Sequence, residues 1–183
     1  MKLIIASDLH GSAYYTGLLI NFYKRSGAEK LLLLGDLIYH GPRNDLPKNY
    51  DCKKVAELLN SVSDEIISVR GNCDSEVDQM MIDFPCLADY AFINDGCVTM
   101  YATHGHIYNK ENLPKLQKGT VLLNGHFHVR EFSNEDGYTY VNPGSVSIPK
   151  GDDPVHSCIE YENGVFKFVN IENDTVYQTF SVI

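Results

Sequence analysis

The sequence predicts an α/β protein in which two β-sheets pack face to face and the helices lie outside. Three observations support this fold class. The first two-thirds of the chain alternates short apolar runs with segments of helical periodicity, which is typical of a parallel sheet. The last third has short β-rich runs separated by Asp-Gly and Asn-Gly pairs, which favour antiparallel hairpins. The 183 residues, 44% of them hydrophobic, contain no linker or repeat, so we expect a single domain over residues 1–183.

In the first part of the chain, three strands alternate with two helices. The first helix is expected over residues 12–25, and Gly27 is placed to end it. The second helix is expected over residues 52–62, with Asp51 as its N-cap. The three strands are short, buried runs rich in Leu and Ile: Leu3–Ala6, Leu31–Leu34 and Ile66–Val69.

The last part of the chain is expected to form strands and hairpins. Asp136-Gly137 and Asn163-Gly164 each mark a tight turn between two β-rich runs. The expected strands are Val98–Ala102, Val121–Leu123, Val129–Phe132 and residues 138–141, 156–161, 164–171 and 175–182, the last four of them antiparallel.

The composition argues against several classes of protein. A formal net charge of −9 disfavours binding to duplex nucleic acid or to anionic membranes, both of which need basic surface. No apolar run is long enough to span a bilayer, and the N-terminus lacks the apolar stretch of a signal peptide, so we expect a cytoplasmic protein. The five cysteines include no C-x-x-C pair, which indicates neither a disulfide framework nor a thiolate zinc site and fits a reducing compartment.

Five of the expected strands end in the same way, with Asp, His or Asn beside a glycine. In α/β sheets, ligands bind at the carboxyl ends of the strands, so these side chains are expected to meet. The five segments are Ser7-Asp8-Leu9-His10-Gly11, Gly35-Asp36, Arg70-Gly71-Asn72-Cys73-Asp74, Thr103-His104-Gly105-His106 and Asn124-Gly125-His126-Phe127-His128.

The residue types in these segments indicate a metal centre. Imidazole suits Zn, Cu, Fe and Ni, and carboxylate or carbonyl oxygen suits harder ions such as Mn. A tetrahedral ion needs about four ligands. Seven are too many for one ion but enough for two ions that share a carboxylate, an arrangement typical of phosphatases, nucleases and some peptidases. The seven candidate ligands are Asp8, His10, Asp36, Asn72, His104, His126 and His128.

Each motif also has a purely structural interpretation when it is taken alone. Asp8 and His10 could form a turn and a helix cap, and Asp36 could lie in an ordinary turn. Asn72 could be a turn residue in the left-handed conformation. The histidines could be hydrogen-bonded polar residues. The recurrence of such residues at five strand ends favours the metal centre.

The motifs D-x-H, G-D, G-N-x-(D/E), H-G-H and G-H-x-H, in this order, resemble those of the calcineurin-like metallophosphoesterases. The resemblance covers the whole chain. Three further stretches are similar to the small bacterial phosphodiesterases of the YfcE type: HGPRN at 40–44, RGNCDSEVDQM at 70–80 and NPGSVSIPKG at 142–151. The resemblance implies a four-layer α-β-β-α sandwich of two mixed β-sheets.

The resemblance also implies a set of ligands and an activity. It assigns Asp8, His10 and His128 to the first metal, Asn72, His104 and His126 to the second, and Asp36 to a bridging position. Of these, Asp36, Asn72 and His104 are expected to be catalytic, as metal-held groups that stabilise the transition state. Mn²⁺ is the expected ion, with Zn²⁺, Fe²⁺, Ni²⁺ or Co²⁺ as alternatives.

The implied reaction is hydrolysis of small phosphodiesters through attack of a metal-bridging hydroxide. Two carboxylates and two divalent ions leave the centre positively charged, which suits a phosphodiester monoanion.

The chain departs from the common family pattern at Cys73, where G-N-H-(E/D) is usual and the His is thought to donate a proton to the leaving group. A thiol with a pKa near ~8.5 matches this duty less well than imidazole, so the general acid is unassigned. His106 and His40 are candidates for it. With Arg43, they are also the expected substrate-binding residues, since Arg can clamp phosphate through two hydrogen bonds. Alternatively, Arg43 is a solvated loop residue and His106 orients a ligand or binds only backbone.

Two other functions fit the same motifs. A phosphomonoesterase would use the same metals, with extra cationic groups for the dianion. A protein-interaction scaffold, like the retromer subunit with this fold, would be free to lose its ligands, yet all seven positions are filled here. The expected partner is a small phosphodiester, without membrane or duplex nucleic acid, and the sequence leaves homo-oligomer formation open.

Overall fold

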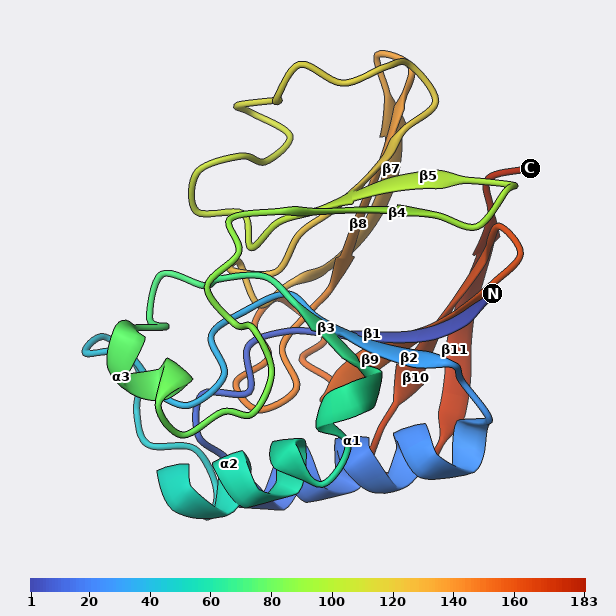
Figure 1. Ribbon diagram of the computed structural model, residues 1–183. Helices are drawn as coiled ribbons and strands as arrows, with labels where there is room; N and C mark the ends of the chain where they lie inside the picture. Colours follow the sequence, from blue (N-terminus) through green and yellow to red (C-terminus); the bar gives the residue numbers. More distant parts are fainter.

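The computed structural model describes residues 1–183 and consists of two mixed β-sheets that face each other (Figure 1). The six-stranded sheet has the order β11-β10-β9-β1-β2-β3, in which β1, β2 and β3 are parallel and β9 is antiparallel to β1. Its strands are β1 (Lys2–Ala6), β2 (Lys30–Leu33), β3 (Ile66–Ser68), β9 (Ser157–Glu162), β10 (Val165–Asn170) and β11 (Thr175–Ser181).

The second sheet has five strands in the order β4-β5-β6-β8-β7. Strands β5, β6 and β8 are parallel, and the edge strands β4 and β7 are antiparallel to their neighbours. Its strands are β4 (Ala91–Asn94), β5 (Thr99–Ala102), β6 (Val121–Leu123), β7 (Arg130–Glu135) and β8 (Tyr138–Pro143).

The helices begin and end where the sequence predicts them to within about two residues, the usual uncertainty of helix boundaries. Helix α1 (Ala13–Ser26) starts after Ser12, whose Oγ accepts the N–H of Tyr15, and it ends at Gly27, whose φ of 69° is left-handed. Helix α2 (Cys52–Asn60) has Asp51 as its N-cap, as expected, because the Asp51 carboxylate accepts the N–H of Lys54. A 3₁₀ turn at Ser63–Glu65 and a short helix α3 (Glu76–Gln79) complete the set.

The inner strands β1 and β2 of the six-stranded sheet are buried on both faces. Ile4, Ala6, Leu31 and Leu33 pack against α1 and α2, which lie below this sheet in Figure 1. The alternate residues point the other way into the core between the sheets, where they meet side chains of β5, β6 and β8: Leu3, Ile5, Leu32 and Leu34. Because each strand alternates its side chains between two apolar layers, the parallel strands read as continuous hydrophobic runs.

Three features differ from the expectation. Strand β4, helix α3 and the 3₁₀ turn were not among the predicted elements. Strand β8 pairs with β6 in parallel as well as with β7 in antiparallel orientation. The outer layer over the five-stranded sheet is irregular chain, the long yellow-green loop of Figure 1, in which Leu116 packs on Tyr101, Leu122 and Tyr140. Helices therefore cover only the six-stranded sheet.

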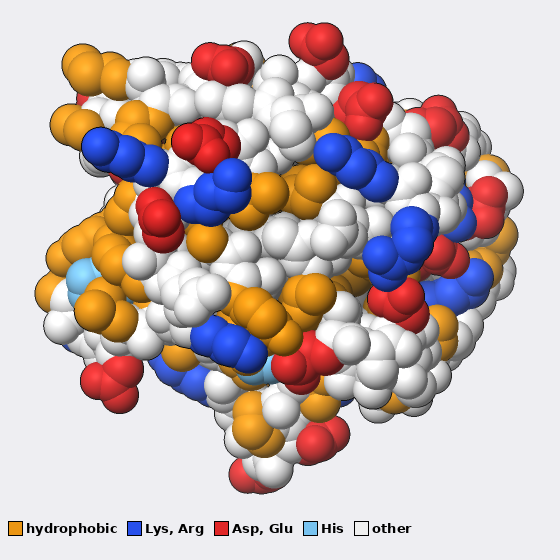
Figure 2. All heavy atoms as spheres, turned by 90° about the horizontal axis from the view of Figure 1, so that it is seen from below, with side chains coloured by type: hydrophobic (Ala, Val, Ile, Leu, Met, Phe, Trp, Pro, Cys, Tyr) orange, Lys and Arg blue, Asp and Glu red, His pale blue; other side chains and the backbone are white.

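The outer face of the helical layer mixes charges of both signs with apolar side chains (Figure 2). No helix of the protein combines the length and the apolar character needed to cross a bilayer.

Candidate metal centre

The centre is built on loops whose backbone is unusual for residues with side chains. Five of the seven expected ligands have a positive φ, in the left-handed region: Asp8 (57°), His10 (45°), Asp36 (55°), His126 (69°) and His128 (61°). A non-glycine residue in this conformation costs about 1–2 kcal/mol, although Asp and His tolerate it better than most. The turns thus hold strain at the positions where side chains converge.

The first group of ligands contains Asp8, His10 and His128, which are all buried. The Nε2 atoms of His10 and His128 lie 3.5 Å and 3.3 Å from the Asp8 Oδ1 atom. The two Nε2 atoms lie 3.1 Å from each other. These separations are those of ligands that each stand about 2 Å from one shared ion.

The protonation pattern of this group fits a metal. The Nδ1 atom of His10 donates to the Tyr39 carbonyl and that of His128 to the Ile148 carbonyl, at 2.9 Å and 2.7 Å. Because a carbonyl oxygen only accepts, Nδ1 carries the proton in the neutral form of each ring, and in that form the two Nε2 lone pairs point at each other. The buried Asp8 Oδ1 atom has no hydrogen-bond donor. A cation between these three atoms would resolve both mismatches.

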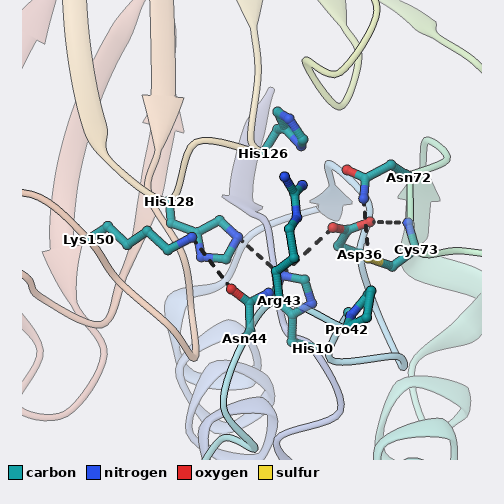
Figure 3. A pocket seen from close by; sticks show the side chains of 11 residues that line it. His10, Asp36, Pro42, Arg43, Asn44, Asn72, Cys73, His126, His128 and Lys150 are labelled. Carbon is teal, nitrogen blue, oxygen red and sulfur yellow. Dashed lines mark hydrogen bonds and ion pairs between the residues drawn. The ribbon is translucent and has the colours of Figure 1, made fainter.

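The second group lies on the other side of Asp36. The Oδ2 atom of Asp36 is 3.4 Å from His104 Nε2 and 3.7 Å from His10 Nε2, so Asp36 stands between the two groups (Figure 3). His104 Nδ1 donates to the Leu34 carbonyl at 2.7 Å, which leaves Nε2 as a ligand atom. The Asn72 Oδ1 atom lies 3.1 Å from that Nε2. Asp36, Asn72 and His104 are therefore brought together as the sequence predicts.

His126 borders the centre in a different way. Its main-chain N–H donates to Asp8 Oδ2 at 2.9 Å, which holds the first group of ligands. Its ring centroid lies 5.1 Å from that of His104, and the ring belongs to neither close group of ligand atoms. Burial and the neighbouring His104 charge lower the pKa of His126 to about 4, so this ring stays neutral and able to bind a metal.

The centre contains two buried carboxylates whose negative charges favour a nearby cation. Burial disfavours ionisation of Asp8, but its close pairing with the His10 and His128 rings holds its pKa well below the usual range. Asp36 also has a lowered pKa, because its pairing with His104 outweighs burial. Reciprocally, these carboxylates raise the pKa of His104 to about 9 in spite of burial. Two buried carboxylates thus remain charged and attract either protons or metal ions.

Asp74 is a buried residue of the site for which the sequence predicts no role, although it ends the G-N-x-(D/E) motif. Its Oδ2 atom accepts the N–H of Asp36 at 2.8 Å and of Gly71 at 2.7 Å, and its Oδ1 atom accepts the N–H of Leu37 at 2.8 Å. Burial nevertheless raises its pKa to about 6. Asp74 therefore fastens the turn that carries Asp36. The only indication of this role in the sequence is that Asp74 follows Asn72 by two residues, at the acidic position of the G-N-x-(D/E) motif.

The stretch at 142–151 stabilises the turn that carries Asp8 through side-chain hydrogen bonds. The hydroxyls of Ser145 and Ser147 both donate to the Asp8 carbonyl, at 2.8 Å and 3.0 Å. Sequence pattern does not reveal that these two serines support Asp8, because the hydrogen bond from Ser145 to Asp8 joins residues 137 positions apart.

A cavity of about 260 Å³ opens over the two groups of ligands. Arg43 reaches into it from the loop after β2, and Lys150 borders it beside His128 (Figure 3). Neither cation forms an ion pair with a protein carboxylate. Lys150 was not among the expected site residues, since nothing in the sequence indicates which way its loop faces.

The other two expected substrate residues do not line this cavity. The His40 ring packs edge-on against Tyr39 and Tyr50, at centroid distances of 4.8 Å and 5.2 Å. The His106 ring is exposed and lies 5.4 Å from the ring of His104. Their contact with substrate stays a prediction.

Cys73 lies in the cavity wall, and its main-chain N–H donates to Asp36 Oδ1 at 2.8 Å. Burial and the nearby Asp36 charge raise the pKa of its thiol to about 12. The thiol therefore holds its proton too tightly to be an efficient acid at neutral pH.

Comparison with known proteins shows which family the chain resembles. Residues 1–164 match the family model described as the calcineurin-like phosphoesterase superfamily domain. The chain is 43% identical over 176 residues to the phosphodiesterase YfcE of Escherichia coli K12, which covers 96% of this chain and 95% of that protein.

Solved structures give the same result. The YfcE phosphoesterase of E. coli superposes with a TM-score of 0.96 at 40% identity and covers all of both chains. Wild-type Vps29 of Entamoeba histolytica in complex with Zn²⁺ has a TM-score of 0.65 at 17% identity over the full length of both chains. At that identity the likeness shows the fold alone.

Proposed function

The chain belongs to the calcineurin-like phosphoesterase superfamily and is a metal-dependent phosphodiesterase, and we propose that it hydrolyses small phosphodiesters at a centre of two divalent ions. The observation that carries this proposal is the position of the Asp36 carboxylate between the His10 and His104 Nε2 atoms, at 3.7 Å and 3.4 Å. A carboxylate between two groups of ligands suits a two-metal site, because one side chain can serve both groups.

In this proposal, Asp8, His10 and His128 would hold one ion, and Asn72, His104 and His126 would hold the other. Asp36 would contact both. When bound, the ions would supply a Lewis acid and lower the pKa of coordinated water, which makes a nucleophile available at neutral pH. Mixed nitrogen and oxygen ligands suit Mn²⁺, our preferred ion, and also Zn²⁺, the ion in the Entamoeba Vps29 complex.

The chain's own residues would orient the substrate. Arg43 and Lys150 are unpaired cations on the cavity wall, placed to contact the unesterified phosphate oxygens. Asp74, through three main-chain hydrogen bonds, would keep Asp36 in position. Because the Cys73 thiol is a poor acid, we expect the enzyme to favour esters with good leaving groups.

A phosphomonoesterase is the second candidate, and the pair of unpaired cations is the observation in its favour. A monoester dianion would gain more from Arg43 and Lys150 than a diester monoanion does. The ratio of rates on the two classes of ester separates these candidates.

The test uses metal-stripped protein that is reloaded with each divalent ion. Bis-p-nitrophenyl phosphate and p-nitrophenyl phosphate are assayed with wild type, His126→Ala and Asn72→Ala. Asn173→Ala, at an exposed turn, is the control. We expect metal-restored diester cleavage that exceeds monoester cleavage, falls at least 100-fold in the two site variants and is unchanged in the control. Faster monoester cleavage would establish the second candidate instead, and no turnover with any ion would refute both.

A further inference from the structure

A second cleft lies beside the metal cavity and differs from it in chemistry. Its volume is about 380 Å³, and seven of its nine lining residues are hydrophobic. It runs between α3 and the segment that leads from β2 into α2. The lining residues are Ile38, Tyr39, Tyr50, Cys52, Cys73, Ser75, Val77, Asp78 and Met81.

Cys73 connects the two spaces, because it lines both the metal cavity and the apolar cleft. Its position along the chain explains this, since it follows Asn72 at the centre and precedes the turn into α3. The apolar cleft therefore lies directly beside the metal cavity, and Cys73 stands in the wall that the two spaces share.

The apolar side chains at the mouth of the cleft are exposed to solvent. Val77 on α3 is 65% exposed and Tyr39 is 41% exposed. From the helical side, hydrophobic side chains gather around a recess in the outline at the end of the molecule where α3 lies (Figure 2). Exposed apolar surface beside a cleft marks a place that a ligand can cover.

The metal cavity offers little apolar contact to an ester group. Only one of its eleven lining residues is hydrophobic, and Arg43 and Lys150 make one side of it cationic. On the side of Cys73 the neighbouring surface is the apolar cleft. An apolar ester group gains more contact there than inside the metal cavity.

We propose that the cleft formed by Tyr39, Tyr50, Val77 and Met81 binds an apolar or aromatic ester group of the phosphodiester whose phosphate lies at the metal centre. This inference rests on the proposed function. It narrows the substrate class to diesters that carry at least one apolar or aromatic arm. Val77 is then a specificity-determining residue, because it can contact the ester group without touching the phosphate.

Binding of esters that resist turnover tests the proposal. Dimethyl, methyl butyl and methyl hexyl phosphate are titrated calorimetrically into Mn²⁺-loaded protein. We expect the Kd to fall about two- to fourfold per added CH₂, the range from partial to full burial of a methylene. Val77→Asn should weaken this chain-length dependence and leave the Kd of dimethyl phosphate unchanged. Val176→Asn, the same change at a 47% exposed position on β11, should behave as wild type.

The outcomes separate this inference from the proposed function. A Kd that is independent of chain length, or a dependence that Val77→Asn leaves intact, overturns the cleft assignment even if bis-p-nitrophenyl phosphate is hydrolysed. A chain-length dependence lost in Val77→Asn supports the assignment even if no diester is hydrolysed, in which case only the proposed function fails.

Discussion

The Asp74 carboxylate accepts the main-chain N–H of Asp36 at 2.8 Å, so one buried acid positions another. Asp74→Asn should disturb this, because an amide offers one acceptor oxygen and turns its NH₂ group towards a backbone donor. We expect a loss of about 2–3 kcal/mol in the free energy of unfolding. Metal affinity should fall roughly 10- to 100-fold. Urea denaturation and metal titration measure the two effects.

Asp83→Asn is the control for this change, because the Asp83 side chain is exposed. It should alter neither quantity. An Asp74→Asn protein with wild-type metal affinity would contradict the role assigned to Asp74.

Gly71 is the residue at which a single methyl group would displace the central ligand. A Cβ atom there would lie 2.1 Å from Asp36 Oδ1 and 2.3 Å from Asp36 N. Gly71→Ala should therefore abolish binding of the second metal and destabilise the fold. Gly17→Ala, where no atom lies within 4 Å of the new methyl in helix α1, should instead stabilise the protein by about 0.5–1 kcal/mol. Elemental analysis measures the metal stoichiometry of Gly71→Ala, and thermal melts measure the stability of both variants.

Metal removal should lower the melting temperature. An ion at 100 times its Kd stabilises the folded state by about 2.7 kcal/mol, which corresponds to roughly 5–10 °C for a chain of this size. Chelation followed by calorimetry, with and without Mn²⁺ added back, measures the shift. Asp8→Asn should lose most of the response to Mn²⁺, and a full response in that variant would be inconsistent with Asp8 as a ligand.

The two sheets are joined by a hydrogen bond that depends on pH. The Tyr161 hydroxyl on β9 donates to Asp95 Oδ2 at 2.6 Å, in the turn between β4 and β5. Burial opposes ionisation of Asp95, but this bond and two main-chain N–H donors lower its pKa. The resulting stability is complete above the unfolded value of about 3.9 and is lost as the pH falls through the lower folded pKa.

Tyr161→Phe should therefore lower the free energy of unfolding by about 1–2 kcal/mol at pH 7 and by progressively less below pH 4. Urea denaturation at pH 7, 4 and 2.5 measures the trend. Tyr138→Phe is the matched control, because its hydroxyl donates to the Leu116 carbonyl, which does not titrate. A cost for Tyr161→Phe that is equal at all three pH values would contradict the assignment.

The parallel strands and the residues at their ends could be predicted because both depend on local pattern. Apolar runs such as Leu31–Leu34 are buried on both faces, and Asp36 follows directly from one of them. Strand β4 gives no such signal. It lies at a sheet edge, and only Ile93 of its four residues is buried, so its run is too short to show a period.

Other parts of the site depend on contacts that only the fold creates. Asp74 hydrogen-bonds to a turn 37 and 38 residues away, and Ser145 to Asp8 across 137 residues. The directions of the His40 and Lys150 side chains depend on loop conformations that composition does not specify. Sequence pattern thus identifies which chemistry gathers at the strand ends, and the fold determines which loop residues join it.

The left-handed backbone at Asp8, His10, Asp36, His126 and His128 has a consequence for laboratory evolution. Glycine adopts this conformation without penalty, so a screen that rewards heat resistance of the metal-free protein should enrich glycine at these positions. Catalysis would be the first property to disappear from such a library. Any programme to make this protein more robust must therefore score turnover in every round, because durability and activity compete at the same five residues.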